Sequence, residues 1–138
     1  MKANPGVAVL VGGDFNTPSH LDWTLDTARV YKHRRELGLP VSLAFERDGF
    51  VDQFRAVYPN PVQHPGITWS PMYRTASDGD QGFERIDRLY LHEDGADQVR
   101  AVSASVLPEV WEDDAIPANK RVFPSDHGAV LIELEWAD

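Results

Sequence analysis

The sequence VAVLVGGDFN, residues 7–16, joins an apolar segment to a polar one. Residues 7–11 are all apolar, which predicts a strand buried on both faces. Gly12 and Gly13 follow, and their conformational freedom lets the backbone turn tightly. Asp14 and Asn16 are therefore expected at the C-terminal end of a strand, where layered α/β folds place residues that carry chemistry.

The rest of the chain predicts helices and then several strands. Ser19, Ser42 and Asp52 are expected to cap helices that run to about residues 37, 49 and 57, and Ser19 with Asp22 resembles a capping box. In one of the later strands, alternation places Val102 and Ala104 on one face. This order of elements fits an α+β fold with helices covering one face of a sheet. The later strands are expected at 67–70, 84–92, 99–107 and 129–136.

The composition limits the class of protein. The chain has 138 residues, of which 42% are hydrophobic and 25% charged, as expected for one globular domain. It contains no cysteine, which excludes a disulfide framework and a thiolate zinc site. The net charge of -9 disfavours electrostatic binding to duplex nucleic acid. The longest apolar run, residues 7–11, is too short for a transmembrane segment, and we expect no signal peptide in this chain.

Polar clusters near three strand ends supply the candidate catalytic residues. Asp14 and Asn16 follow the first strand, Asp87 lies in a later strand, and Asp126 and His127 precede the last one. Each has an ordinary explanation when taken singly. Asp-x-Asn is common in turns, a strand aspartate often pairs with a surface arginine, and a histidine is often structural. Together they are an inventory for the hydrolysis of a phosphate ester.

The chemistry of the side chains supports this interpretation. Asp14 and Asp126 are hard oxygen ligands suited to Mg²⁺ or Mn²⁺. The amide of Asn16 can donate a hydrogen bond to a phosphoryl oxygen. Asp87 can fix the tautomer and orientation of His127 and stabilise its imidazolium form.

Four motifs in a fixed order give a specific resemblance. They are Gly13-Asp14-Phe15-Asn16, Thr68-Trp69, Arg85-Ile86-Asp87 and Ser125-Asp126-His127. In their order and approximate spacing, from residue 7 to residue 134, the chain resembles the endonuclease/exonuclease/phosphatase family. The resemblance implies one half, the C-terminal half, of a DNase I-like four-layer α/β sandwich, with a mostly antiparallel sheet. It also implies a Mg²⁺- or Mn²⁺-dependent hydrolase of phosphate esters, either a phosphodiesterase or a phosphatase.

The resemblance assigns a role to each catalytic candidate. Asp14 matches the aspartate that orients or deprotonates the attacking water, and Asn16 matches the asparagine that holds phosphate and helps to place that aspartate. Asp126 matches the motif aspartate associated with the metal. His127 matches the histidine that contacts the phosphoryl group, and Asp87 matches the carboxylate paired with that histidine.

Other positions near the motifs are less specific. His20 and Trp23 lie in a segment that resembles one bacterial branch of the family, so His20 is a candidate for substrate binding. The alternative is that this segment caps a helix and Trp23 packs beneath it. Thr68 and Trp69 are expected to support packing and loops. Arg88 stands where many members of the family carry an aromatic residue.

The resemblance also implies a missing part. The first half of the family's sandwich normally supplies an asparagine and the principal metal-binding glutamate. The first acidic residue here is Asp14, and Asn4 lacks the matching context. We therefore expect an incomplete metal shell and an uncovered apolar face on the inner side of the sheet. The partner that covers it is expected to be the missing N-terminal half of a truncated protein, a separate chain, or a second copy in a homodimer.

Two functional interpretations follow for the chain as it stands. The first is a phosphate-ester hydrolase that is weak or inactive as this isolated half. The second is a non-catalytic remnant or binding module that has lost the metal-binding half.

Overall fold

The computed structural model describes residues 7–31, 35–69, 84–107 and 123–137. Its strands are β1 (Leu10–Asp14), β2 (Phe50–Asp52), β3 (Asp87–His92), β4 (Val99–Leu107) and β5 (Ala129–Trp136). Its helices are α1 (Leu25–Val30), α2 (Pro40–Arg47) and α3 (Gln53–Val57), and a 3₁₀ turn covers Glu93–Gly95. None of the helices in the described ranges has the length and apolar character needed to span a bilayer.

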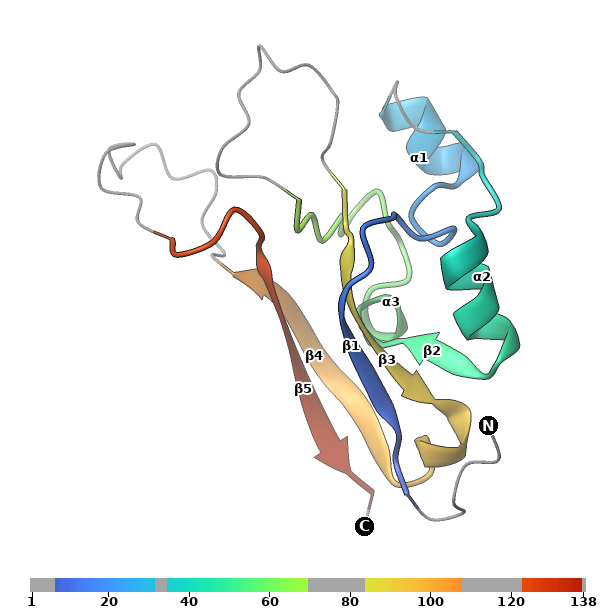
Figure 1. The fold of residues 1–138 in the computed structure, drawn as a ribbon, viewed down its shortest axis with the longest axis vertical. Helices are drawn as coiled ribbons and strands as arrows, with labels where there is room; N and C mark the ends of the chain where they lie inside the picture. The colour runs from blue at the N-terminus through green and yellow to red at the C-terminus, as the bar shows by residue number, and fades with distance from the viewer. Residues whose placement is uncertain (1–6, 32–34, 70–83, 108–122, 138) are drawn as a thin grey trace.

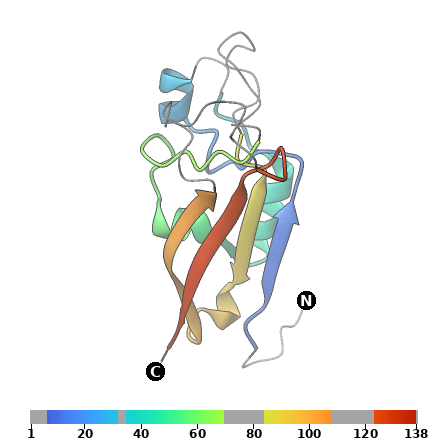
Figure 2. The same cartoon turned by 90° about the vertical axis from the view of Figure 1, so that its left-hand side faces the viewer.

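The strands form two antiparallel groups that lie side by side. β3 is the centre of a three-stranded sheet, with β1 on one side and β2 on the other, and β4 pairs with β5. Trp69 connects the groups through isolated bridges to Glu84, ahead of β3, and to His127, ahead of β5. Figure 1 shows α1 and α2 on one side of the strands, and Figure 2 shows the strands in front of the helices. The predicted α+β class, with helices on one face of antiparallel strands, is confirmed.

Aromatic side chains fill the space between β3 and α2. Phe45 of α2 stacks on Tyr90 of β3 with ring centroids 4.5 Å apart. Phe15 meets both rings edge-on, at 5.2 Å from Phe45 and 5.5 Å from Tyr90. Aromatic pairs in such geometries contribute about 0.5–1.5 kcal/mol beyond the burial of their area. These contacts hold residue 15, next to Asp14, against the sheet.

A buried network of two aspartates and two arginines ties distant segments together. Arg85 pairs with Asp22 at 2.9 Å and with Asp52 at 2.7 Å, and Arg55 pairs with Asp22 at 2.6 Å. Burial on its own lowers the pKa of Arg85, but the two carboxylates more than offset this and raise the pKa above its ordinary value. The network therefore joins the turn before α1, the start of α3 and the segment leading into β3.

The sheet face turned away from the helices presents apolar side chains to solvent. Because Tyr90 points to α2, the next residue, Leu91, points the other way. Leu10 and Val51 pair with Leu91 from either side, so they share its face, and they are 43% and 47% exposed. On β5, Leu131 is 56% exposed.

The first strand differs from its prediction in position and in burial. It covers Leu10–Asp14 rather than residues 7–11, and it continues through both glycines. The expected burial on both faces is wrong, because none of residues 7–11 is buried, and Val7 and Leu10 are 53% and 43% exposed. Gly12 serves close packing here, since a Cβ atom at that position would lie 3.0 Å from Leu89 Cδ1.

The helix boundaries also differ from the prediction. Residues 20–23 form turns, and α1 begins after Thr24, which shares a capping box with Thr27. Asp22 is bound to two buried arginines and so is not a cap. α2 begins at Pro40, a favoured first helical residue, so Ser42 lies inside the helix. The cap at Asp52 is confirmed, because its side chain accepts from two amides of α3.

A bulge interrupts the alternation in β4. The register with β5 shifts between Ala101 and Ser103, so Val102 has no partner residue opposite it. Val102 is 44% exposed, whereas Ala104 is buried. The prediction that these two residues share a face is therefore wrong.

Candidate active site

Asp14 and Asn16 form a tight polar turn where β1 ends. The backbone N–H of Asn16 donates to Asp14 Oδ1 at 2.8 Å, and its side-chain amide donates to Oδ2 at 3.0 Å. Asn16 adopts φ 50, a left-handed conformation that asparagine tolerates better than most residues. Phe15 N–H donates to Ile86 O at 2.9 Å and so fixes this turn to the segment ahead of β3. Both oxygens of Asp14 are held while the carboxylate stays exposed.

Asp87 and His127 form a hydrogen-bonded pair. Asp87 Oδ2 lies 2.9 Å from His127 Nδ1, although the residues are 40 positions apart. The backbone N–H of His127 donates to Ser125 Oγ at 3.0 Å, and the Trp69 ring lies 4.6 Å from the imidazole ring. With Nδ1 donating to the carboxylate, Nε2 is the imidazole atom left to meet a substrate.

The Asp14–Asn16 turn and the Asp87–His127 pair lie next to each other. Asp14 lies opposite Asp87 in the antiparallel register of β1 and β3, and His127 comes from the segment ahead of β5. One ligand atom from each of these three side chains lies within 4.8 Å of the others. We call Asp14, Asp87 and His127 the Asp–Asp–His cluster. The structure thus brings together side chains from three distant stretches of sequence.

The cluster favours a protonated His127. Its pKa is raised above the ordinary 6.5, first by the hydrogen bond to Asp87, against a smaller opposing effect of burial. The charges of Asp87, Asp14 and Asp126 add to the increase. The pair therefore stabilises the folded chain fully below pH 6.5, and this contribution is lost as pH rises through the raised pKa.

Asp126 takes a different position from the other candidates. It is exposed and does not belong to the Asp–Asp–His cluster, although its charge acts on His127. Of the two predicted metal ligands, the structure places Asp14 in the cluster and Asp126 beside it.

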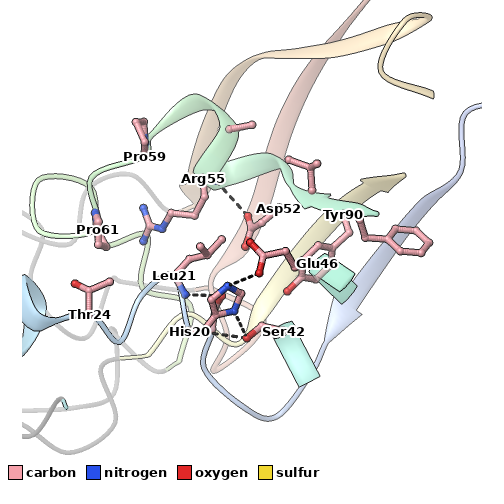
Figure 3. Close-up of a pocket in the computed structure, with 14 residues that line it drawn as sticks. His20, Leu21, Thr24, Ser42, Glu46, Asp52, Arg55, Pro59, Pro61 and Tyr90 are labelled. Atoms are coloured by element: carbon pink, nitrogen blue, oxygen red, sulfur yellow. Dashed lines mark hydrogen bonds and ion pairs between the residues drawn. The ribbon is translucent and has the colours of Figure 1, made fainter. Parts of the chain in front are cut away.

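His20 lies apart from the cluster. Its backbone N–H and its ring Nδ1 meet Ser42 Oγ at 2.9 and 2.8 Å, and its Nε2 is 3.3 Å from Glu46. These side chains line a cavity of about 400 Å³ next to α2 and α3, shown in Figure 3. No member of the Asp–Asp–His cluster lines this cavity. The contacts of His20 are therefore with α2 and not with the predicted site.

Thr68 has a larger part in the site than its sequence context indicates. Its hydroxyl accepts hydrogen bonds from the N–H of Ile86 at 3.0 Å and of Asp87 at 3.1 Å, and the residue is fully buried. Its carbonyl accepts from Gly128 N–H at 2.7 Å. Thr68 therefore fixes the backbone on both sides of the Asp87–His127 bond. The Thr68-Trp69 motif is the signal in the sequence that points to this residue, and it predicts a supporting role without naming these contacts.

Replacing Thr68 by valine is expected to lower the pKa of His127 toward 6.5. Valine has a similar shape but leaves two buried N–H groups without an acceptor, at a cost of about 1–3 kcal/mol, so Asp87 shifts from its partner. NMR titration of the imidazole in EDTA measures the pKa. Thr68→Ser keeps the hydroxyl and should keep the raised pKa. Equal pKa values in both variants and the wild type would contradict this role.

A carboxylate held by an amide, beside a carboxylate–imidazole pair, is an arrangement typical of a hydrolytic centre. Comparison with known proteins agrees. The profile of the Endonuclease/Exonuclease/phosphatase family matches residues 1–127, so the chain belongs to this family. Members of the family are generally hydrolases that act on phosphate esters.

An uncharacterized protein of Caenorhabditis elegans is similar to almost the whole chain. It is 34% identical over 142 residues, which cover 99% of this chain and 43% of the relative. The chain therefore spans less than half the length of that relative.

The donor atoms of the cluster fit a hard divalent cation in part. Asp14 offers an exposed carboxylate, the kind of ligand that Mg²⁺ and Mn²⁺ prefer. Asp87 and His127 are engaged with each other through Oδ2 and Nδ1, so their capacity for a cation is reduced. Each oxygen of Asp14 accepts one hydrogen bond from Asn16 and keeps a second lone pair, so Asp14 is the best-placed protein ligand within the described residues. Asp126 lies outside the cluster, and its charge acts on His127.

Proposed function

We propose that this protein hydrolyses phosphate esters with the help of Mg²⁺ or Mn²⁺. The observation that carries the proposal is the convergence of Asp14, Asp87 and His127 within 4.8 Å. A cation bound at Asp14 and Asp126 would supply Lewis-acid stabilisation of the phosphoryl oxygens.

The side chains divide the remaining work. Asp14 accepts a proton from the attacking water, and the two hydrogen bonds from Asn16 keep its carboxylate in a fixed orientation. Protonated His127 places a positive donor at the phosphoryl group, where negative charge develops as the new P–O bond forms and the ester P–O bond breaks. Asp87 keeps this imidazole oriented and charged.

The uncovered sheet face supports a second part of the proposal. Leu10 of β1, Val51 of β2 and Leu131 of β5 are 43%, 47% and 56% exposed. We infer that another layer packs here, from a longer form of the protein, a separate chain or a second copy, and completes the metal shell. The isolated chain is accordingly expected to be weakly active or inactive.

The substrate is proposed to be a small or membrane-derived phosphate ester. A net charge of -9 repels a polyanion, so duplex DNA is the less favoured substrate. Comparing hydrolysis of a diester with hydrolysis of a monoester distinguishes the two classes of ester.

The test compares bis(p-nitrophenyl) phosphate, a diester, with p-nitrophenyl phosphate, a monoester, in Mg²⁺, Mn²⁺ or EDTA. The isolated chain and the longest natural form of the protein are assayed side by side. We expect turnover by the longer form that requires the cation and stops in EDTA. Turnover that is indifferent to EDTA would contradict the proposal. Binding of the diester without turnover by the longer form would favour the alternative, a non-catalytic binding module.

A further inference from the structure

Arg88 is buried without a carboxylate partner. It follows Asp87 in β3, and because side chains alternate along a strand it points to the helix side, where it is only 2% exposed. No ion pair to Arg88 is formed within the described part of the chain. Its Nε and Nη2 atoms have no hydrogen-bond partner there either. Burial lowers the pKa of this guanidinium.

Arg88 contacts the turn that carries Asn16. Its Nη1 donates to Thr17 O at 2.7 Å and to Arg85 O at 3.2 Å. Its guanidinium carbon lies 4.8 Å from the centre of the Phe15 ring. Arg88 therefore holds the residue before Asn16 and the residue after it.

Stability alone gives no reason for an arginine at this position. A buried charge without a partner is costly, and apolar residues of similar volume often replace buried charges with no loss of stability. The neighbouring rings of Phe15 and Tyr90 would accept an apolar side chain. Unsatisfied buried polar groups in native proteins are frequently associated with function.

We propose that Arg88 is a positioning residue for the active site. It fixes residues 15–17, and through them it keeps Asp14 and Asn16 in place beside Asp87 and His127. Adjacent residues of β3 thus hold the two parts of the site, since Asp87 binds His127 on one face and Arg88 holds the Asn16 turn from the other. This role in catalysis rests on the proposed hydrolysis.

The test uses Arg88→Met, which keeps the length and removes the donors, and Arg88→Lys, which keeps a charge and can still reach Thr17 O. Amide hydrogen exchange and thermal unfolding are measured on this chain, and turnover is measured on the longest natural form of the protein. In Arg88→Met we expect the amides of Phe15 and Asn16 to exchange at least about tenfold faster, while those of β4 and β5 are unchanged. The midpoint of unfolding should stay the same or rise.

Turnover should fall about tenfold to a hundredfold in Arg88→Met and recover in part in Arg88→Lys. Unchanged exchange at Phe15 and Asn16 in Arg88→Met would overturn the proposal. So would a lower unfolding midpoint with faster exchange throughout the chain, because that pattern marks a purely structural residue. The exchange and unfolding measurements need no substrate. A longest natural form without hydrolysis would therefore refute the proposed function and leave the anchoring of residues 15–17 to be decided separately.

Discussion

Replacing His127 by glutamine should lower the rate of phosphate-ester hydrolysis by about a hundredfold or more. Glutamine keeps a hydrogen-bonding side chain of similar length but carries no positive charge near neutral pH. In the wild type the bond to Asp87 at 2.9 Å raises the pKa of His127, so the protonated form persists to higher pH. The measurement is kcat for the preferred p-nitrophenyl ester across a range of pH. Asp14→Asn, which removes the proton acceptor, should cause a loss of the same order.

Matched substitutions away from the cluster serve as controls. His64→Gln changes a histidine stacked on Tyr58, and Asp26→Asn changes an exposed carboxylate paired with Arg29 on α1. Both should keep wild-type turnover. Wild-type rates in His127→Gln and Asp14→Asn together would show that the cluster is not the catalytic centre.

Replacing Arg85 by methionine should lower the free energy of unfolding by about 3–5 kcal/mol. The arginine is 1% exposed and pairs with Asp22 and Asp52, which are also buried. Methionine fills a similar space but leaves the Asp52 carboxylate without an arginine partner. Asp22 keeps Arg55 as its only arginine partner. Denaturant unfolding monitored by tryptophan fluorescence measures the change.

The surface pair Arg100–Glu135 offers the comparison. Its side chains are 74% and 54% exposed at a separation of 2.7 Å, so Arg100→Met should cost no more than about 1 kcal/mol. Similar losses of unfolding free energy in Arg85→Met and Arg100→Met would mean that burial does not determine how much the network contributes to stability.

Sequence reasoning works best where local chemistry and long-range pairing agree. β4 and the Asp52 cap of α3 follow from alternation and capping, and both are observed with the expected bounds. The Asp–Asp–His cluster could also be predicted, because its residues lie at strand ends. Strand ends that meet at one edge of a sheet bring their side chains together. Asp14 and Asp87 are direct partners across β1 and β3.

Sequence reasoning fails where a distant partner decides the role of a side chain. Asp22 has the local context of a helix cap, yet Arg55 and Arg85, far along the chain, bind it in the interior. His20 is close to the catalytic motif in sequence, yet it bonds to Ser42 across the chain and lines another cavity. Local sequence patterns carry no information about such distant partners. A bulge such as the one at Val102 likewise depends on the opposing strand.

The register that sets Asp14 against Asp87 also has a kinetic consequence. A slip of one residue would turn Asp14 to the helix side of the sheet and dismantle the centre. Contacts between such distant segments form slowly, because the closure entropy of long loops must be overcome first. During refolding, helical signal should therefore return before catalytic competence. The rate at which turnover recovers would then report the rate at which β1 pairs with β3. Molecules with the wrong register would form a folded fraction without activity.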